Sequence, residues 1–120
     1  MPARLRPATA AQVGAALAAA PRDPAQVRLL VKHFLAVLAE RAPGASVEVR
    51  VPPYAAVQAV AGVRHTRGTP PAVVELDAET WIALATGELT WTDAESAGRV
   101  RASGERADLS PLLPLTEEDA

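Results

Sequence analysis

The 120-residue sequence predicts an α+β domain in which a small, mostly antiparallel sheet is covered on one face by helices. Two stretches near the N-terminus predict helices: the first is rich in alanine, and the second carries apolar residues at three- and four-residue spacing, which is typical of an amphipathic helix. Further along the chain the apolar spacing changes to two, as in strands with one buried face. Short helical stretches separate the last strands, and neither an internal repeat nor a linker interrupts the pattern. We therefore expect a single domain.

The first helix is expected in the alanine-rich stretch after Thr9, which can cap it, and before Pro21, which would end it. The second helix has the clearest pattern, because Asp23 can cap it and Pro24 suits its first position. Its apolar residues form a stripe that would face one partner surface: Val27, Leu30, Val31, Phe34, Leu35 and Leu38. The stretch "APGAS" then turns the chain.

The alternation in "SVEVRV" predicts a strand with Val47, Val49 and Val51 on one face and Glu48 and Arg50 on the other. The two prolines that follow end this strand, since neither can donate to a ladder. The next stretch, "YAAVQAVAGV", fits either a strand or a helix. Because it follows a strand and a tight break, we favour a second strand that returns beside the first.

The stretch "AVVELD" is expected to form a third strand after the polar loop "RHTRGTPP". Asp77 can cap a short helix, "AETWIALAT", and Gly87 can end it because glycine adopts the left-handed conformation at low cost. Either Thr90 or Thr92 can cap another short helix, "TDAESA", which Gly98 would end.

The stretch "RVRASG" alternates again and predicts a last strand with Val100 and Ala102 facing inward. A short apolar segment, "ADLSPLLPL", would then close the domain. We expect the domain to comprise residues 9–115, between a flexible start at residues 1–8 and an acidic tail at residues 116–120.

Composition narrows the function classes. Hydrophobic residues make up 49% of the chain but aromatic residues only 3%, so small branched side chains must build the core. A net charge of −2 creates no field that would attract nucleic acid. The absence of cysteine excludes disulfides and thiolate catalysis. No apolar run approaches the ~20 residues of a membrane span, so we expect a cytoplasmic protein without stable membrane insertion.

Motifs of the common enzyme classes are missing, including the nucleophile elbow, the Walker loop and the dinucleotide fingerprint. We therefore expect a protein that is not an enzyme and that uses no cofactor. Only His33 and His65 could act as bases near neutral pH, and we interpret His33 as a helix residue at the core edge or in solvent. The two histidines lack the spacing of a zinc site, so no metal is expected.

The loop "RHTRGTPP" admits two interpretations. Arg64, His65 and Arg67 could form an anion site for a phosphate or a carboxylate, since guanidinium and imidazole groups bind such oxygens. The interpretation that we favour is a solvated connection whose glycine and prolines set the turn geometry.

The run from Ala72 to Leu115 contains, in order, a strand, a capped helix, a "TGE" helix stop, a second short helix and an arginine-flanked strand that ends near glycine. In this order and spacing it resembles the C-terminal half of the type-two sterol carrier protein domain. The tract from "VEVRVPPY" to "ATGEL" is similar to a short stand-alone branch of that family found in actinobacteria, the bacterial sterol carrier orthologues.

The resemblance implies a carrier with an apolar cavity between helices and sheet that holds a fatty acid or a sterol-like molecule. The residues that would line it are Phe34, Leu38, Trp81, Leu84, Leu89 and Trp91. The alternative is a structural or regulatory protein-interaction module, in which these side chains close the core and no ligand binds. The chain has room for only about three strands before the "TGE" stop, so the cavity is expected to be small or filled. The alanine-rich first helix could form a homodimer surface or pack on the sheet.

Overall fold

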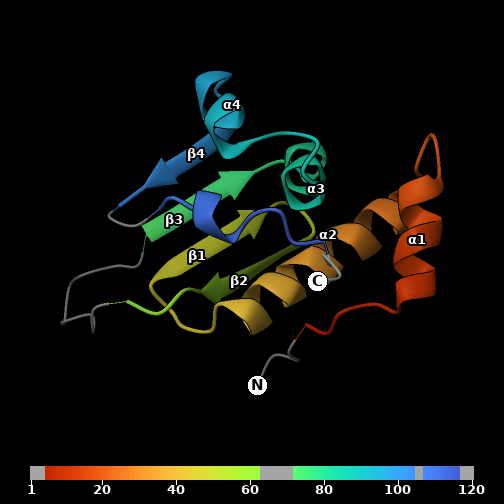
Figure 1. Ribbon diagram of the computed structural model, residues 1–120, viewed down its shortest axis with the longest axis horizontal. Coiled ribbons are helices and arrows are strands. Elements are labelled where there is room, and N and C mark those ends of the chain that lie inside the picture. The colour runs from red at the N-terminus through yellow and green to blue at the C-terminus, as the bar shows by residue number, and fades with distance from the viewer. Residues whose placement is uncertain (1–4, 63–71, 105–106, 117–120) are drawn as a thin grey trace.

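The computed structural model describes residues 5–62, 72–104 and 107–116. Within these residues the elements are α1 (Ala10–Ala18), α2 (Pro24–Arg41), β1 (Val47–Val51), β2 (Ala55–Ala59), β3 (Ala72–Leu76), α3 (Ala78–Thr86), α4 (Trp91–Ser96), β4 (Val100–Ser103) and the 3₁₀ helix η1 (Ser110–Leu112). The expected α+β class is confirmed (Figure 1).

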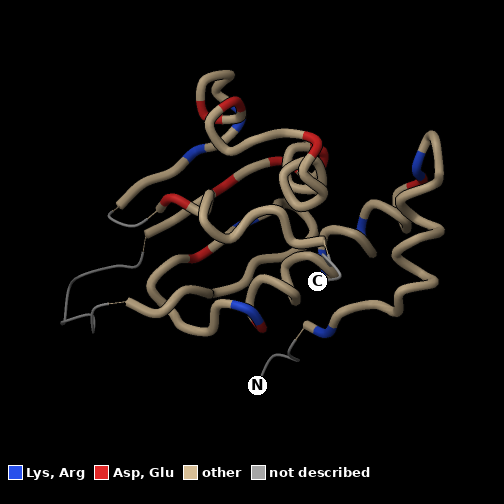
Figure 2. The backbone as a smooth tube through the Cα atoms, viewed as in Figure 1, with Lys and Arg blue, Asp and Glu red and all other residues tan. Residues whose placement is uncertain are grey.

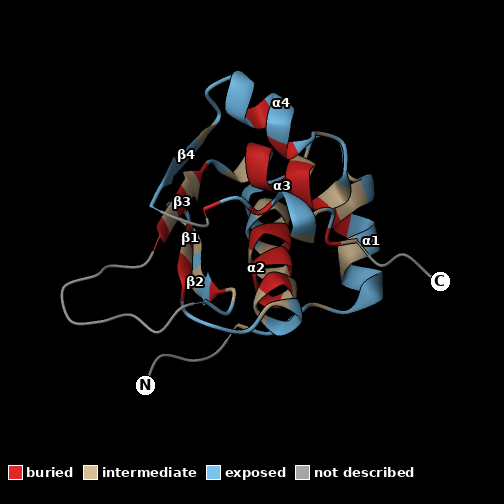
Figure 3. Cartoon of the chain, turned by 60° about the vertical axis from the view of Figure 1, so that its left-hand side comes forward, coloured by how far each residue is buried: buried red, intermediate tan, exposed pale blue. Residues whose placement is uncertain are grey.

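The four strands form one sheet in the order β2-β1-β3-β4. The outer pairs β1–β2 and β3–β4 are antiparallel, whereas β1 and β3 in the centre are parallel, with Val49 opposite Val74. The sheet is therefore mixed and mostly antiparallel, as expected. The helices α2 and α3 cover one of its faces, and α1 lies on the side of α2 that faces away from the sheet (Figure 3).

Capping residues set the helix starts where the sequence predicts them. The Asp23 carboxylate accepts a hydrogen bond from the Gln26 backbone N–H at 2.8 Å, and the Gln26 side chain accepts the Asp23 N–H at 2.9 Å, which completes a capping box. Asp77 caps α3 through the Thr80 N–H at 2.7 Å. Gly87 ends α3 with a positive φ of 84°, a conformation that suits glycine.

Two features differ from the expectations, the end of α1 and the burial of Ala102, and the open choice between two caps of α4 is decided. The helix α1 ends at Ala18, before Pro21. Thr90 rather than Thr92 caps α4, so Trp91 becomes the first residue of that helix. Ala102 was expected to face inward but is exposed, because β4 is an edge strand and α2 packs on β2 at the other edge of the sheet.

Charge is distributed unevenly over the fold. The outward face of the sheet is polar, with Arg50 and Glu48 paired at 3.0 Å, whereas α1 carries no charged residue (Figure 2). The apolar stripe of α2 is buried against α3 and the sheet, and Val27 at its start is half-buried. An uncharged helix packed on α2 therefore has apolar neighbours on one side and solvent on the other.

Candidate apolar ligand site

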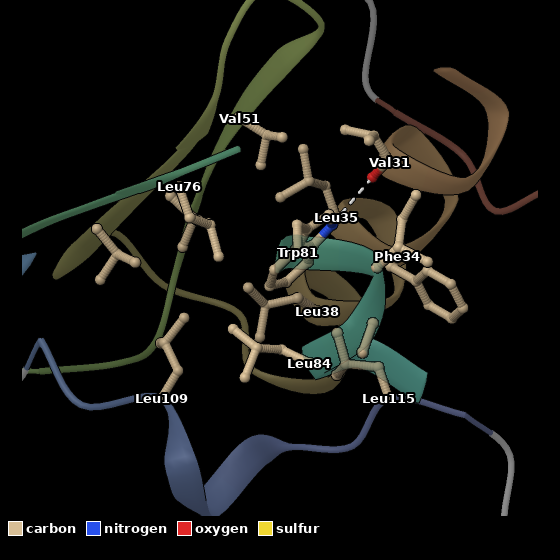
Figure 4. Close-up of a cluster of buried hydrophobic side chains, with 14 of the residues drawn as sticks. Val31, Phe34, Leu35, Leu38, Val51, Leu76, Trp81, Leu84, Leu109 and Leu115 are labelled. Carbon is tan, nitrogen blue, oxygen red and sulfur yellow. Dashed lines mark hydrogen bonds between the residues drawn. The ribbon is translucent and has the colours of Figure 1, made fainter. Parts of the chain in front are cut away.

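Most of the side chains expected to line a cavity instead lie packed together in the core (Figure 4). Trp81 and Leu38 are 0% exposed, and Phe34 and Leu84 are 1% exposed. The Trp81 indole Nε1–H donates a hydrogen bond to the Val31 carbonyl at 3.3 Å, which ties α3 to α2. The structure thus brings these four residues together across α2 and α3.

The closing segment covers one side of this cluster. Leu109 is fully buried and Leu115 nearly so, and the Leu115 backbone N–H donates to the Ala85 carbonyl at 2.8 Å. Figure 4 shows both leucines beside Leu84, below the Trp81 ring. Large side chains from four parts of the chain therefore fill the space around Trp81.

The other two expected residues border a small pocket of about 270 Å³. Leu89 is half-buried and Trp91 is 5% exposed, and both lie beyond the end of α3. The pocket is lined by Leu84, Gly87, Leu89, Thr90, Trp91, Thr92, Ser110, Leu113 and Pro114.

A larger groove of about 500 Å³ lies between α1, α2, the N-terminal segment and the closing segment. Its apolar walls come from Val13 and Leu17 of α1, Phe34 and Val37 of α2, and Leu115. The rest of the lining is Pro7, Ala8, Ala10, Gly14, His33, Glu40, Arg41 and Thr116. Of the six expected residues, only Phe34 borders this groove.

Sequence reasoning missed the groove because it depends on where α1 packs. The spacing of Val13 and Leu17 predicts an apolar face on α1, but the pattern does not specify whether this face contacts the sheet, a second copy or α2. In the structure α1 packs against α2. The signal that could have located the groove is Gly14, because a glycine between two apolar residues leaves one position of the face without a side chain.

His33 lines the groove and is hydrogen-bonded to its N-terminal edge. Its Nδ1 accepts a hydrogen bond from the Ala8 backbone N–H at 2.9 Å, so the ring proton resides on Nε2. The imidazole meets the Phe34 ring edge-on, with the ring centroids 4.9 Å apart. Burial lowers the pKa of His33 below its ordinary value, and the Glu40 carboxylate opposes that shift. The ring is therefore neutral at neutral pH.

A third pocket, of about 350 Å³, is polar and lies beside β3 and β4. It contains two carboxylates, Glu75 and Asp77, and two guanidinium groups, Arg99 and Arg101. The Arg99 Nε–H donates to the Thr80 hydroxyl at 3.1 Å. With its charges balanced, this pocket does not match an apolar ligand.

The remaining expectations concern other parts of the chain. Arg64, His65 and Arg67 of the expected anion site lie outside the described residues. Within the described ranges, no group of three or more His, Cys, Asp or Glu side chains is placed to hold a metal ion. None of the helices in these ranges combines the length and the apolar character of a membrane span.

A protein-family model described as bacterial SCP ortholog matches residues 23–115. The chain belongs to this family. The sterol carrier protein-like identity inferred from the motif order is thereby confirmed. A search of curated proteins finds no match to the chain.

The matched range determines which parts of the site belong to the bacterial SCP ortholog domain. It begins at Asp23, the cap of α2, and ends at Leu115, so it includes every buried residue of the core cluster except Ala16 of α1. The helix α1 and the segment before it lie outside the match. One wall of the groove therefore comes from the family domain and the other from the preceding N-terminal part.

Proposed function

We propose that this bacterial SCP ortholog binds one apolar molecule, a fatty acid or a sterol-like lipid, in the groove between α1 and α2 and carries it without chemical change. The observation that carries the proposal is the groove itself. At about 500 Å³ it falls within the range of small-molecule sites, roughly 300–1,000 Å³, and its walls are mainly apolar. The sterol carrier-like family membership supports a lipid as the ligand class.

The proposal gives the expected residues different roles. Phe34 contacts the ligand from the floor of the groove, while Leu38, Trp81 and Leu84 support that floor from within the core. Trp81 and Leu38 border none of the three pockets described above. The pocket beside Leu89 and Trp91 is the competing site, and it is smaller than the groove.

Affinity would come from apolar contact. Each buried methylene contributes about 0.8 kcal/mol, so an acyl chain that inserts several methylenes between α1 and α2 gains enough free energy for stable binding. His33, Glu40 and Arg41 supply polar groups that can meet the polar end of such a molecule. They form no nucleophile–base pair, which is consistent with a carrier that does no chemistry.

Gly14 offers a direct test, because a Cβ placed on it would meet no atom within 4 Å. The variant Gly14→Leu extends a side chain into the groove, whereas Gly14→Ala leaves most of the space open. In Ala15→Leu the same side chain is added to an exposed position of the same helix that does not line the groove. All three variants keep α1 free of charge. Both Gly14 substitutions raise the helix propensity, and Ala15→Leu replaces alanine by another good helix former.

The measurement is a titration with cis-parinaric acid, a fluorescent fatty acid. We expect Gly14→Leu to weaken binding at least roughly tenfold, since it displaces several methylenes worth about 0.8 kcal/mol each. Gly14→Ala and Ala15→Leu should bind like the unchanged protein. Equal affinity in all four proteins would overturn the groove as the binding site, and no saturable binding in any of them would overturn the carrier function.

A further inference from the structure

The N-terminal segment, residues 5–9, forms one edge of the groove. Leu5 packs against the core, Pro7 and Ala8 line the groove, and Thr9 caps α1. Figure 1 shows this segment running alongside α2 to the start of α1. Among the described residues, a single hydrogen bond joins the segment to α2: the Ala8 N–H donates to His33 Nδ1 at 2.9 Å. The hydrogen bond between this edge of the groove and α2 therefore depends on an acceptor that a proton can remove.

We propose that His33 is a pH-sensitive latch on the groove. Protonation of Nδ1 converts the acceptor into a donor, breaks the bond to the Ala8 N–H and frees the N-terminal segment from α2. The groove then loses the wall formed by Pro7 and Ala8, and a bound apolar molecule dissociates faster. The effect on the ligand rests on the proposed function, whereas the release of the segment does not.

The surroundings of His33 favour a closed latch at neutral pH. Burial lowers the pKa of the imidazole, while Glu40 on the same helix pulls the pKa up by a smaller amount. Arg41 of α2 also lines the groove, and the charged residues next along the chain are Lys32, which precedes His33, and Arg6, two positions before Ala8. The groove residues of α1 are uncharged, and the closing segment contributes the uncharged Thr116 and Leu115.

The sign of the pH effect follows from linkage. When the segment is released, the imidazole becomes more exposed to water and its pKa rises toward about 6.5, so the open form binds more protons than the closed form. Opening is therefore promoted as the pH falls below about 6.5 and is suppressed above it. An acidic compartment or surface would favour release of the carried molecule.

The first experiment needs no ligand. The protection of the Ala8 amide against hydrogen exchange is measured by NMR near pH 7.5 and near pH 5, with the His33 ring signals recorded as a monitor of protonation. In the unchanged protein we expect protection to fall roughly fivefold in acid, the factor that corresponds to one hydrogen bond. His33→Asn, whose side-chain oxygen can replace Nδ1 as acceptor, should keep protection at both pH values, and His33→Phe should lack it at both.

Two results would overturn the latch. One is unchanged Ala8 protection while the ring signals show that His33 has gained a proton. The other is a ring that stays neutral down to about pH 5, below which few histidines remain uncharged.

A second experiment separates the latch from the proposed function. The dissociation constant of diphenylhexatriene, an apolar probe without a titratable group, is measured at the same two pH values. We expect about fivefold weaker binding in acid for the unchanged protein and pH-independent binding for His33→Asn. If Ala8 responds to pH but the probe binds at neither pH, the proposed function fails and the latch stands. If the probe binds and Ala8 does not respond, the latch fails and the proposed function stands.

Discussion

The most informative perturbation of the core is Trp81→Ala. Trp81 of α3 is fully buried against α2 and the closing segment, and it donates a hydrogen bond to the Val31 carbonyl. Truncation of a large aromatic side chain in a filled core costs about 3–5 kcal/mol, since both the transfer free energy and the contacts around the new cavity are lost. If the Trp81 ring bordered an empty ligand cavity, one face of the ring would make few contacts. The loss of unfolding free energy on truncation would then be far smaller.

Urea unfolding followed by far-ultraviolet circular dichroism gives the free energy of unfolding. The slope of the unfolding free energy against urea concentration must be the same in the variant and the unchanged protein. Only then does a shift of the midpoint report a change in stability alone. The matched control is Leu89→Ala, because Leu89 is half-buried and should lose only about 1 kcal/mol. A loss below about 1 kcal/mol for Trp81→Ala would refute the filled core and restore a cavity beneath Trp81 as the ligand site.

The two glycines Gly14 and Gly44 should respond to alanine with opposite signs. Gly14→Ala should raise the free energy of unfolding by about 0.5–1 kcal/mol, because the glycine lies inside α1 and a Cβ there meets open space. Gly44→Ala should lower it by more than about 2 kcal/mol, since Gly44 has a φ of +149° and a Cβ there would overlap the Val60 backbone. Thermal and urea unfolding of the two variants check both signs, and a stabilised Gly44→Ala would contradict the described packing of that turn.

Local patterns in the sequence were sufficient to predict most of the fold. Asp23, Asp77 and Gly87 mark helix ends through interactions with the nearest few residues, so the residue types alone carry the information. The alternating valines of β1 likewise predict a strand with one buried face. The exposed Ala102 was predicted wrongly because burial at a sheet edge depends on how far the covering helices extend, which alternation does not encode.

The candidate site was harder to predict, because it depends on contacts between distant segments. The tryptophans drew attention as the largest apolar groups, but Trp81 is surrounded by α2 and by leucines of the closing segment. The groove arises where α1 packs on α2, and its polar contact joins Ala8 to His33 across 25 positions. No periodicity within one helix specifies which other helix it contacts.

The measurement that tests the central claim most directly is methyl NMR of the protein during titration with palmitic acid. If the groove between α1 and α2 is the carrier site, saturable shifts should appear at the methyl groups of Val13, Leu17 and Val37, which line it. The methyl groups of the buried strand residue Val49 should remain unchanged. Shifts confined to Leu84 and Leu89, or no saturable shift at any methyl group, would contradict the account.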